Sequence, residues 1–366
     1  MNIVYGVSGE GLGHVFEAIE IGRALRADGH AIRMLTYGDR AVRSLAEFAP
    51  TRIEGVQLCM TQRGFSLPKT VRMNLGCVPY YLRNGRRLIR ELSEFGPDVF
   101  ITAYEPFTMI ASHLLRRPLV SMDNQNELRH LRRPRGASPF AFHLANLATR
   151  FVTFGAEDYI VKSFGRRARP RPHVHVVSPV IQEEIRGLRP AAGQHVLVYL
   201  TKENPRLIEL LKSLPETFVV YCHNREGKDA NLTYRAQGAA YPADLAACKA
   251  IIATTGFSLI ADSIFLKKPY FGVPLRGQFE QTYNAFFLRS SGIGDYSEMP
   301  TRDELGRFLG ALPEFRRRLE TVDSDPLDQA RTLRGLLAGY RARAPSEGLP
   351  PEAEKDDPVA VDRGQE

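Results

Sequence analysis

A histidine follows a glycine-rich turn close to the start of the chain. Residues 3–7 form a short apolar run, Gly9, Gly11 and Gly13 follow it, and His14 comes next. Glycine allows positive φ and close approach of the backbone to a ligand, and the free N–H groups at a helix N-terminus attract anions. A neutral imidazole can take a proton from a hydroxyl group near neutral pH. We therefore expect an anion-binding turn with His14 at its mouth.

This turn is a poor match to a dinucleotide-binding site. The fingerprint of such sites requires the spacing G-x-G-x-x-G and an acidic residue after the second strand. Here the glycines are two residues apart each time, and Thr36-Tyr37-Gly38 precedes the nearest acidic residue, Asp39. A nicotinamide cofactor is therefore not favoured.

A second turn in the other half of the chain is a better candidate for binding a diphosphate. An apolar run ends at Thr254, and a predicted helix begins after a glycine. The residues concerned are Thr255, Gly256, Phe257, Ser258 and, one turn later, Asp262. Backbone amides at the helix entrance would bind the diphosphate, and Asp262 would accept from ribose hydroxyls. Alternatively, Ser258 caps the helix and Asp262 complements its dipole; the residues alone leave both interpretations open.

Polar side chains also follow two other predicted strands of the second half. Glu280 and Gln281 come after the strand at 270–273, and they can hold adjacent sugar hydroxyls by acceptor and donor contacts. Lys202 follows the strand at 195–201, where it either reaches the diphosphate or lies in a solvated loop. Ligands of open α/β sheets bind at the carboxyl ends of strands.

The elements that must position these residues alternate between strand and helix. In the first half, the pattern predicts strands at 3–7, 31–36, 51–58, 99–102 and 119–122, and helices at 15–27, 41–48 and 78–95. In the second half, it predicts strands at 195–201, 218–223, 233–236, 250–254 and 270–273, and helices at 205–213, 242–248 and 257–266. Alternation of this kind indicates βαβ units and parallel sheets. We expect an α/β protein with two such halves joined by a linker at 166–178, where arginine and proline gather.

Taken together, the motifs resemble a GT-B glycosyltransferase. The resemblance rests on the loop at 9–14, the turn and helix at 255–262 and the segment at 280–285. More narrowly, they are similar to family 28-like relatives of the N-acetylglucosaminyltransferase that completes the lipid-linked peptidoglycan precursor. Residues 98–106 and 121–125 resemble a poorly characterised branch of that group. The likeness covers most of residues 1–300 in order and spacing.

The resemblance implies two Rossmann-like parallel-sheet domains facing across a cleft. Residues 1–165 would bind the acceptor and residues 179–325 the nucleotide sugar, while a helix at about 326–342 would pack back on the first domain. Gly11, Gly13 and Lys202 would help bind the donor. Gly256–Ser258 would hold the diphosphate, Asp262 (usually glutamate in the family) the ribose, and Glu280 with Gln281 the sugar. Such enzymes invert the anomeric centre and need no bound cofactor or catalytic metal.

His14 matches the histidine that the family places at the mouth of the first loop, and it is our candidate general base. Many inverting relatives have an acidic residue just after the strand at 99–102, where this chain has Ala103. Either Glu105 or Asp123 would then orient the histidine, or neither does. By position, Tyr104, Asn124 and Gln125 are expected on the acceptor side.

Composition is consistent with a cytoplasmic globular protein. The 366 residues include 43% hydrophobic and 25% charged residues, with no apolar run long enough to span a membrane and no signal peptide expected. The four cysteines are scattered, without the spacing of a metal site or disulfide framework. The net charge of +8 comes from arginine clusters, but no nucleic-acid-binding motif accompanies them. Residues 344–366 are predicted to form a disordered tail.

We therefore predict an inverting hexosyl- or N-acetylhexosaminyltransferase that uses a UDP- or dTDP-sugar. The acceptor is either a small molecule or lipid-linked, because the basic and apolar segment at 71–90 could rest on the inner face of a membrane or simply pack on the sheet. The alternatives are a UDP-sugar 2-epimerase of the same fold, using Glu105 and Asp123, and a non-catalytic nucleotide-sugar-binding protein. The oligomeric state is left open.

Overall fold

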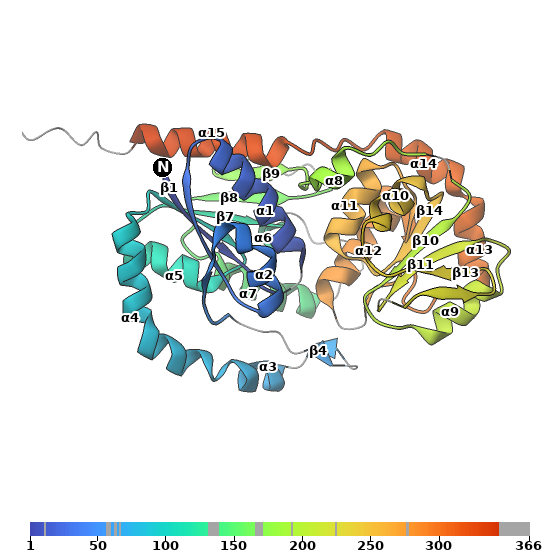
Figure 1. The fold of residues 1–366 in the computed structure, drawn as a ribbon, viewed down its shortest axis with the longest axis horizontal. Coiled ribbons are helices and arrows are strands. Elements are labelled where there is room, and N and C mark those ends of the chain that lie inside the picture. Colours follow the sequence, from blue (N-terminus) through green and yellow to red (C-terminus); the bar gives the residue numbers. More distant parts are fainter. Residues whose placement is uncertain are drawn as a thin grey trace, which may run out of the picture.

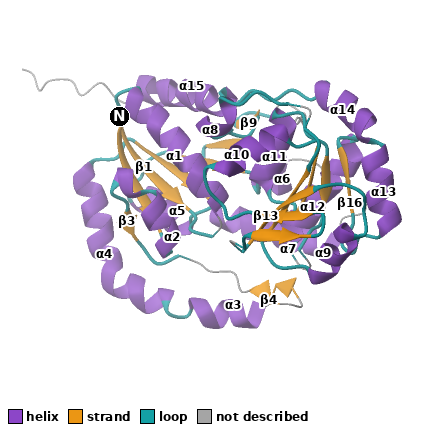
Figure 2. Ribbon diagram, turned by 45° about the vertical axis from the view of Figure 1, so that its right-hand side comes forward, coloured by secondary structure: helices purple, strands orange, loops and turns teal. Residues whose placement is uncertain are grey.

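The computed structural model describes residues 1–10, 12–55, 60–61, 64–65, 67–130, 139–164, 171–191, 193–223, 225–275 and 278–343. Its strands form two seven-stranded sheets and a short hairpin. The two sheets lie side by side, each between helices (Figures 1 and 2). This is the predicted α/β architecture of two Rossmann-like parallel-sheet units.

The first sheet has the strand order β3-β2-β1-β6-β7-β8-β9, and all of its strand pairs are parallel. The elements of this half are β1 (Asn2–Val7), α1 (Leu12–Ala27), β2 (Ala31–Thr36), α2 (Asp39–Ser44), the short 3₁₀ helix η1 (Ala46–Phe48), β3 (Thr51–Arg52), β4 (Met60–Thr61), β5 (Gly64–Phe65), α3 (Leu67–Asn74), α4 (Cys77–Phe95), β6 (Val99–Ala103), α5 (Pro106–Leu114), β7 (Leu119–Asp123), α6 (Asn126–His130), α7 (Pro139–Val152), β8 (Asp158–Lys162) and β9 (Val174–Val177).

The second sheet has the order β12-β13-β11-β10-β14-β15-β16 and is parallel except at the β12–β13 edge. Its elements are α8 (Glu183–Arg186), β10 (Val196–Leu200), α9 (Pro205–Lys212), β11 (Phe218–Cys222), β12 (Gly227–Asp229), β13 (Leu232–Tyr234), α10 (Ala240–Ala247), β14 (Ala250–Ala253), α11 (Phe257–Phe265), β15 (Tyr270–Gly272), α12 (Phe279–Ser291), β16 (Gly294–Tyr296), α13 (Arg302–Gly310) and α14 (Leu312–Glu320). The chain then continues into α15 (Asp328–Arg343).

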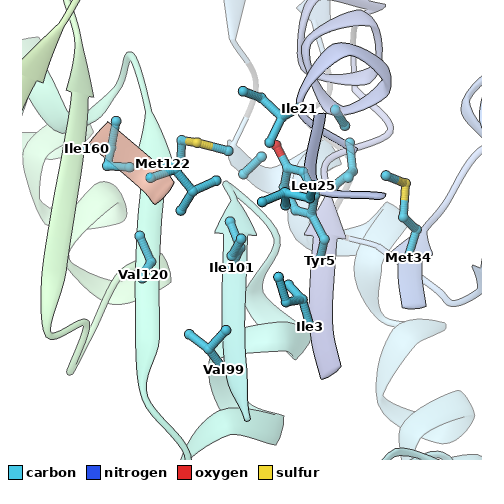
Figure 3. Packing of buried hydrophobic residues seen from close by; sticks show 14 of the residues in the cluster. Ile3, Tyr5, Ile21, Leu25, Met34, Val99, Ile101, Val120, Met122 and Ile160 are labelled. Atoms are coloured by element: carbon cyan, nitrogen blue, oxygen red, sulfur yellow. The ribbon is translucent and has the colours of Figure 1, made fainter. Parts of the chain in front are cut away.

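Strand β1 shows why these runs are apolar throughout. Ile3, Tyr5 and Val7 pack in the core on one face of the first sheet, and Val4 packs in the core on the other face. A strand covered by helices on both sides needs apolar residues at every position. Figure 3 shows the first of these cores, where Tyr5 lies among side chains from α1 and neighbouring strands.

Helix α15 packs against the first sheet rather than the second. Leu333, Leu337 and Tyr340 are buried in the same core as β1, and the Tyr340 hydroxyl donates to Asp158 of β8 at 2.5 Å. In Figure 1 the helix runs back along α1 and β9 after the second sheet has been completed. The C-terminal part of the described chain therefore connects the two halves.

Some predicted boundaries differ from the structure. The helix expected at 41–48 is α2 followed by η1, with a break at Leu45. Part of the predicted linker at 166–178 is strand β9, because Val174–Val177 pairs with β8 and extends the first sheet by one strand. Residues 166–170, residues 56–58 of the strand expected at 51–58 and the predicted tail lie outside the described residues.

Candidate active site

Residues from both halves of the chain line one pocket. Helix α1 contributes Gly13, Phe16 and Glu17, and helix α11 contributes Phe257, Ser258 and Asp262. Lys162, at the end of β8, and residues of the segment before α8 complete the lining. The N-terminal ends of α1 and α11 approach each other here, since a Cβ added to Gly13 would lie 2.9 Å from Ser258 Oγ. A side chain at position 13 would therefore require Ser258 to move, and Gly11 lies outside the described residues.

His14 lies in the first turn of α1, not at the mouth of the turn before it. Its Nδ1 atom is 4.0 Å from Oδ2 of Asp123, which ends strand β7. The His14 side chain is 14% exposed and that of Asp123 is fully buried. Burial, with a further contribution from the Lys162 cation, lowers the pKa of His14 to about 4, and burial raises the pKa of Asp123 to about 6. At neutral pH the imidazole is therefore neutral and the carboxylate is charged.

The strand-end residues after Asp123 connect the two halves of the chain. Asn124 Nδ2 donates to Oε1 of Glu280, in the first turn of α12, at 2.9 Å. The backbone N–H of Gln125 donates to Asp123 Oδ1 at 2.8 Å, and the Gln125 amide lies between the carboxylates of Asp123 and Glu280. The structure thus brings together Asp123, Asn124, Gln125 and Glu280.

Glu105 does not orient His14, which corrects one of the two options considered for the catalytic carboxylate. It is the N-cap of α5, with oxygens that accept from Phe107 N at 2.8 Å, Thr108 N at 2.7 Å and Thr108 Oγ1 at 2.5 Å. The residue is 1% exposed. Both carboxylate oxygens are therefore occupied by the start of the helix, and Asp123 is the carboxylate beside His14.

Tyr104 has an unusual backbone conformation next to these residues. Its φ is +59°, in the left-handed region that few residues other than glycine adopt. Burial raises the pKa of its hydroxyl to about 12, although a hydrogen bond with Thr149 acts in the opposite direction; Asp123 and Glu280 also raise it. Strained backbone of this kind tends to occur at functional sites, and the phenol is close enough to Asp123 and Glu280 for their charges to affect its pKa.

The N-terminus of α11 has no cap among the described side chains. Its N-cap is Gly256, and no described side chain bonds the first N–H groups. A Cβ at Gly256 would meet no described atom within 4 Å. Thr255 is buried and donates through Oγ1 to the carbonyl of Gln281 at 2.7 Å, so it fixes the turn. The N–H groups of Phe257 and Ser258 are consequently available to an anion, which the dipole of the helix would also attract.

Asp262 and Phe257 lie further along the same pocket. Asp262 is 7% exposed, and burial alone raises its pKa to about 7. The Phe257 ring packs against Phe164, which lies between β8 and β9, with centroids 4.3 Å apart and the rings tilted by 30°. Phe257 therefore contacts a residue of the segment that joins two strands of the first sheet, besides lying at the helix entrance.

The other two predicted donor residues differ in their placement. Gln281 Oε1 accepts from Leu275 N at 3.0 Å, which leaves its NH₂ group as the part that can donate to a ligand. Lys202 is exposed after β10, at the same edge of the sheet as the α11 entrance. Its assignment to the diphosphate stays a prediction. Within the described ranges no group of three His, Cys, Asp or Glu side chains is arranged to hold a metal.

The model of glycosyl transferase family 1 matches residues 1–313, which is most of the chain. The chain belongs to this family. An uncharacterized glycosyltransferase of Methanosarcina mazei is 28% identical to this family 1 chain over 140 residues. That alignment covers 37% of the chain and 36% of the relative, so it spans about a third of the relative's length. These matches do not show the narrower resemblance to the peptidoglycan-precursor transferase, which stays a prediction.

Solved glycosyltransferases share the fold of this family 1 chain. Spinosyn forosaminyltransferase SpnP superposes with a TM-score of 0.63 at 19% identity, over 92% of this chain and 99% of SpnP. Spinosyn rhamnosyltransferase SpnG, solved with thymidine diphosphate, gives a TM-score of 0.60 at 15% identity, over 92% and 100% of the two chains. At these identities the likeness establishes the GT-B fold.

Sequence reasoning missed a buried ionic group beside His14. Lys162 is 2% exposed and forms an ion pair with Glu17 of α1, whose other carboxylate oxygen accepts from Gln329 of α15. Nothing in the sequence near Lys162 indicates this role, because lysine is rarely buried and the residues around Lys162 in the structure are distant from it in the sequence. Only the spacing of His14 and Glu17, one helical turn apart, could have suggested that they share a face.

Proposed function

We propose that this chain is an inverting glycosyltransferase that moves a sugar from a UDP- or dTDP-sugar to an acceptor hydroxyl, with His14 as the general base. One observation carries the proposal: His14, which faces Asp123 of β7, lies at the start of α1, and this end of α1 approaches the uncapped end of α11 in the other half. Gly13, the neighbour of His14, approaches Ser258, and both residues line one pocket. This arrangement supports a base and an anion-binding site close to each other.

The base step follows from the charge states of the pair. His14 is neutral at pH 7 and takes the proton of the acceptor hydroxyl as its oxygen attacks the anomeric carbon. Asp123, which is ionised, then stabilises the imidazolium that forms. The negative charge of a bound diphosphate would raise the pKa of His14 toward the working pH and make it a better base.

Departure of the nucleoside diphosphate builds up negative charge near α11. The open helix N-terminus stabilises that charge without having to reorganise. In this proposal Asp262 accepts from the ribose hydroxyls, and Glu280 with the Gln281 NH₂ group contacts the hydroxyls of a hexosyl or N-acetylhexosaminyl group. The thymidine diphosphate present in SpnG supports a nucleoside diphosphate as the leaving group.

The acceptor is proposed to be a small molecule or lipid-linked. Val71, Leu75, Val78 and Leu82 lie along α3 and α4 and are 53–79% exposed, although no described helix could cross a membrane. Arginines accompany them, including Arg72, Arg83, Arg86 and Arg90. Contact of this surface with an anionic membrane stays a prediction. Co-sedimentation with phosphatidylglycerol vesicles, lost in Leu82→Glu, checks it; equal sedimentation of both proteins would remove it.

Neither alternative gains support from the geometry. A 2-epimerase would need carboxylates to manage elimination and re-addition, and of the two candidates Glu105 is occupied as a helix cap. Formation of an epimerised sugar without any acceptor would nevertheless indicate the 2-epimerase. A non-catalytic binding protein would bind nucleotide sugars but transfer no sugar to any acceptor of a broad panel.

The test compares His14→Ala with His195→Ala. His195 precedes β10, at the opposite edge of its sheet from the site, and its ring bonds the carbonyl of Asp244. With UDP- and dTDP-sugars and an acceptor panel, His14→Ala is expected to lower turnover by roughly 10²–10⁴-fold. Nucleotide affinity, measured by calorimetry, should stay nearly constant, and His195→Ala should keep its turnover. Wild-type turnover in His14→Ala would remove the base assignment.

A further inference from the structure

Two acid–base pairs lie side by side between α1 and the ends of neighbouring strands. On α1, His14 and Glu17 are three residues apart and share a face. Opposite them, Asp123 ends β7 and Lys162 ends β8, and these strands are paired with Asp123 level with Val161. His14 faces Asp123, and Glu17 contacts Lys162.

The Glu17–Lys162 pair is buried and fixed from several sides. The Lys162 and Glu17 side chains are 3% and 10% exposed. Gln329 of α15 donates to the second carboxylate oxygen of Glu17. Lys162 also lies 6.0 Å from the centre of the Phe257 ring at the α11 entrance. A pair held in this way cannot turn into solvent, so its charges act on their neighbours with little screening.

The other charged groups around His14 come from different elements. Asp123 faces it from β7, Glu280 approaches from α12, and the phenol of Tyr104 lies near both carboxylates. Beneath them Tyr5 of β1 is fully buried, and its hydroxyl has no hydrogen-bond partner among the described residues. Lys162 is the cation that acts on His14 in this group, where the other charged side chains are carboxylates.

We propose that Glu17 and Lys162 are positioning residues that set the charge state of His14, and thereby the pH range in which it can act as a base. The inference rests on the proposed function. Lys162 disfavours the imidazolium and Glu17 favours it, so the two charges act in opposite directions. Gln329 of α15 donates to the Glu17 carboxylate and so helps to fix the position of the Glu17–Lys162 pair.

The sign of each effect gives the test. Without the Lys162 cation, His14 protonates more easily, so the acid limb of the kcat/KM profile in Lys162→Met should move to higher pH by about one unit. Without the Glu17 charge, the limb in Glu17→Gln should move to lower pH, and the double variant should lie between the two. A shift of one unit corresponds to a roughly tenfold lower kcat/KM for Lys162→Met than for the wild type at pH values on the acid limbs of both profiles.

Glu20→Gln is the matched control. Glu20 lies on the same helix and pairs with Arg186 at 2.8 Å, but it does not act on His14. It should leave the limb unchanged, whereas a general loosening of α1 would move all three variants together. The His14 imidazole is also titrated by NMR in each protein, with folding monitored by near-ultraviolet circular dichroism, and opposite shifts in the two single variants are expected.

The outcomes separate this inference from the proposed function. If His14→Ala is inactive while Glu17→Gln and Lys162→Met titrate like the wild type, His14 is the base and the pair does not tune it. If His14→Ala keeps its turnover while the NMR shifts are opposite, the electrostatic coupling is real and the base assignment is wrong. Should Lys162→Met not fold, Glu17→Gln, whose amide oxygen can still accept from Lys162, and the uncharged double variant still decide the direction of the shift.

Discussion

Helices α5 and α11 occupy matching places in the two halves but begin in opposite ways. Each follows the strand beside the first strand of its sheet, β6 next to β1 and β14 next to β10, and each is nine residues long. Helix α5 is capped by the buried carboxylate of Glu105. Helix α11 begins at Gly256, without a side-chain cap.

The difference is between a helix end occupied by a carboxylate of the protein and one that the described residues leave uncapped. At α5, a carboxylate of the protein itself occupies the position where an anion would bind, and Gly6 of β1 lies against it: a Cβ there would collide with Thr108 and come within 3.0 Å of Glu105 Oε2. At α11, the N–H groups and the space in front of Gly256 are left for a ligand. The same architecture therefore has a side-chain cap at the start of α5 and, among the described residues, none at the start of α11.

An acidic N-cap on α11, like the one on α5, should produce the largest effect on nucleotide binding. Gly256 has φ −69° and ψ 140°, which any residue can adopt, and a Cβ there meets no described atom within 4 Å. In Gly256→Asp the carboxylate should bond the N–H groups of the helix entrance and repel a diphosphate. We expect the affinity for dTDP or UDP, measured by calorimetry, to fall at least about tenfold, while the unliganded protein becomes more stable by a few tenths of a kcal/mol.

The control for this prediction is Gly256→Asn, which has nearly the same shape and also caps helices, but carries no charge. It should weaken nucleotide binding less than Gly256→Asp does. Equal affinities for wild type and both variants would place the diphosphate elsewhere, whereas equal losses in both variants would indicate that space, not charge, decides binding.

The fold and the position of the α11 entrance could be predicted because their signals are local. Apolar runs between glycine turns indicated the parallel sheets, and the helix predicted at 257–266 is α11, observed at Phe257–Phe265. The cap of α5 also had a local signal that was read differently: Pro106 at the first helical position after an acidic residue is typical of an N-cap, so Glu105 could have been recognised as structural.

Asp123 was one of the two carboxylates considered for orienting His14, but the rest of the arrangement around His14 could not be predicted, because it depends on contacts between distant segments. Asp123 and Lys162 reach the face of α1 only through the order of β7 and β8 in the sheet, and Gln329 is 312 residues from Glu17. Strand β8 itself has charged residues at both ends, Asp158 and Lys162, which normally indicate exposure. In this fold both ends are buried by partners from α1 and α15.

Removing the side-chain cap of α5 should affect stability rather than binding. In Glu105→Ala, the N–H groups of Phe107 and Thr108 and the Thr108 hydroxyl lose their acceptor in a buried place. We expect the free energy of unfolding, measured in urea, to fall by about 2–3 kcal/mol. Thr301→Ala in the exposed capping box of α13 calibrates the result, and about 1 kcal/mol is expected there. If Glu105→Ala instead kept full stability and lost turnover, its carboxylate would belong to the catalytic group and the contrast between the two helices would fail.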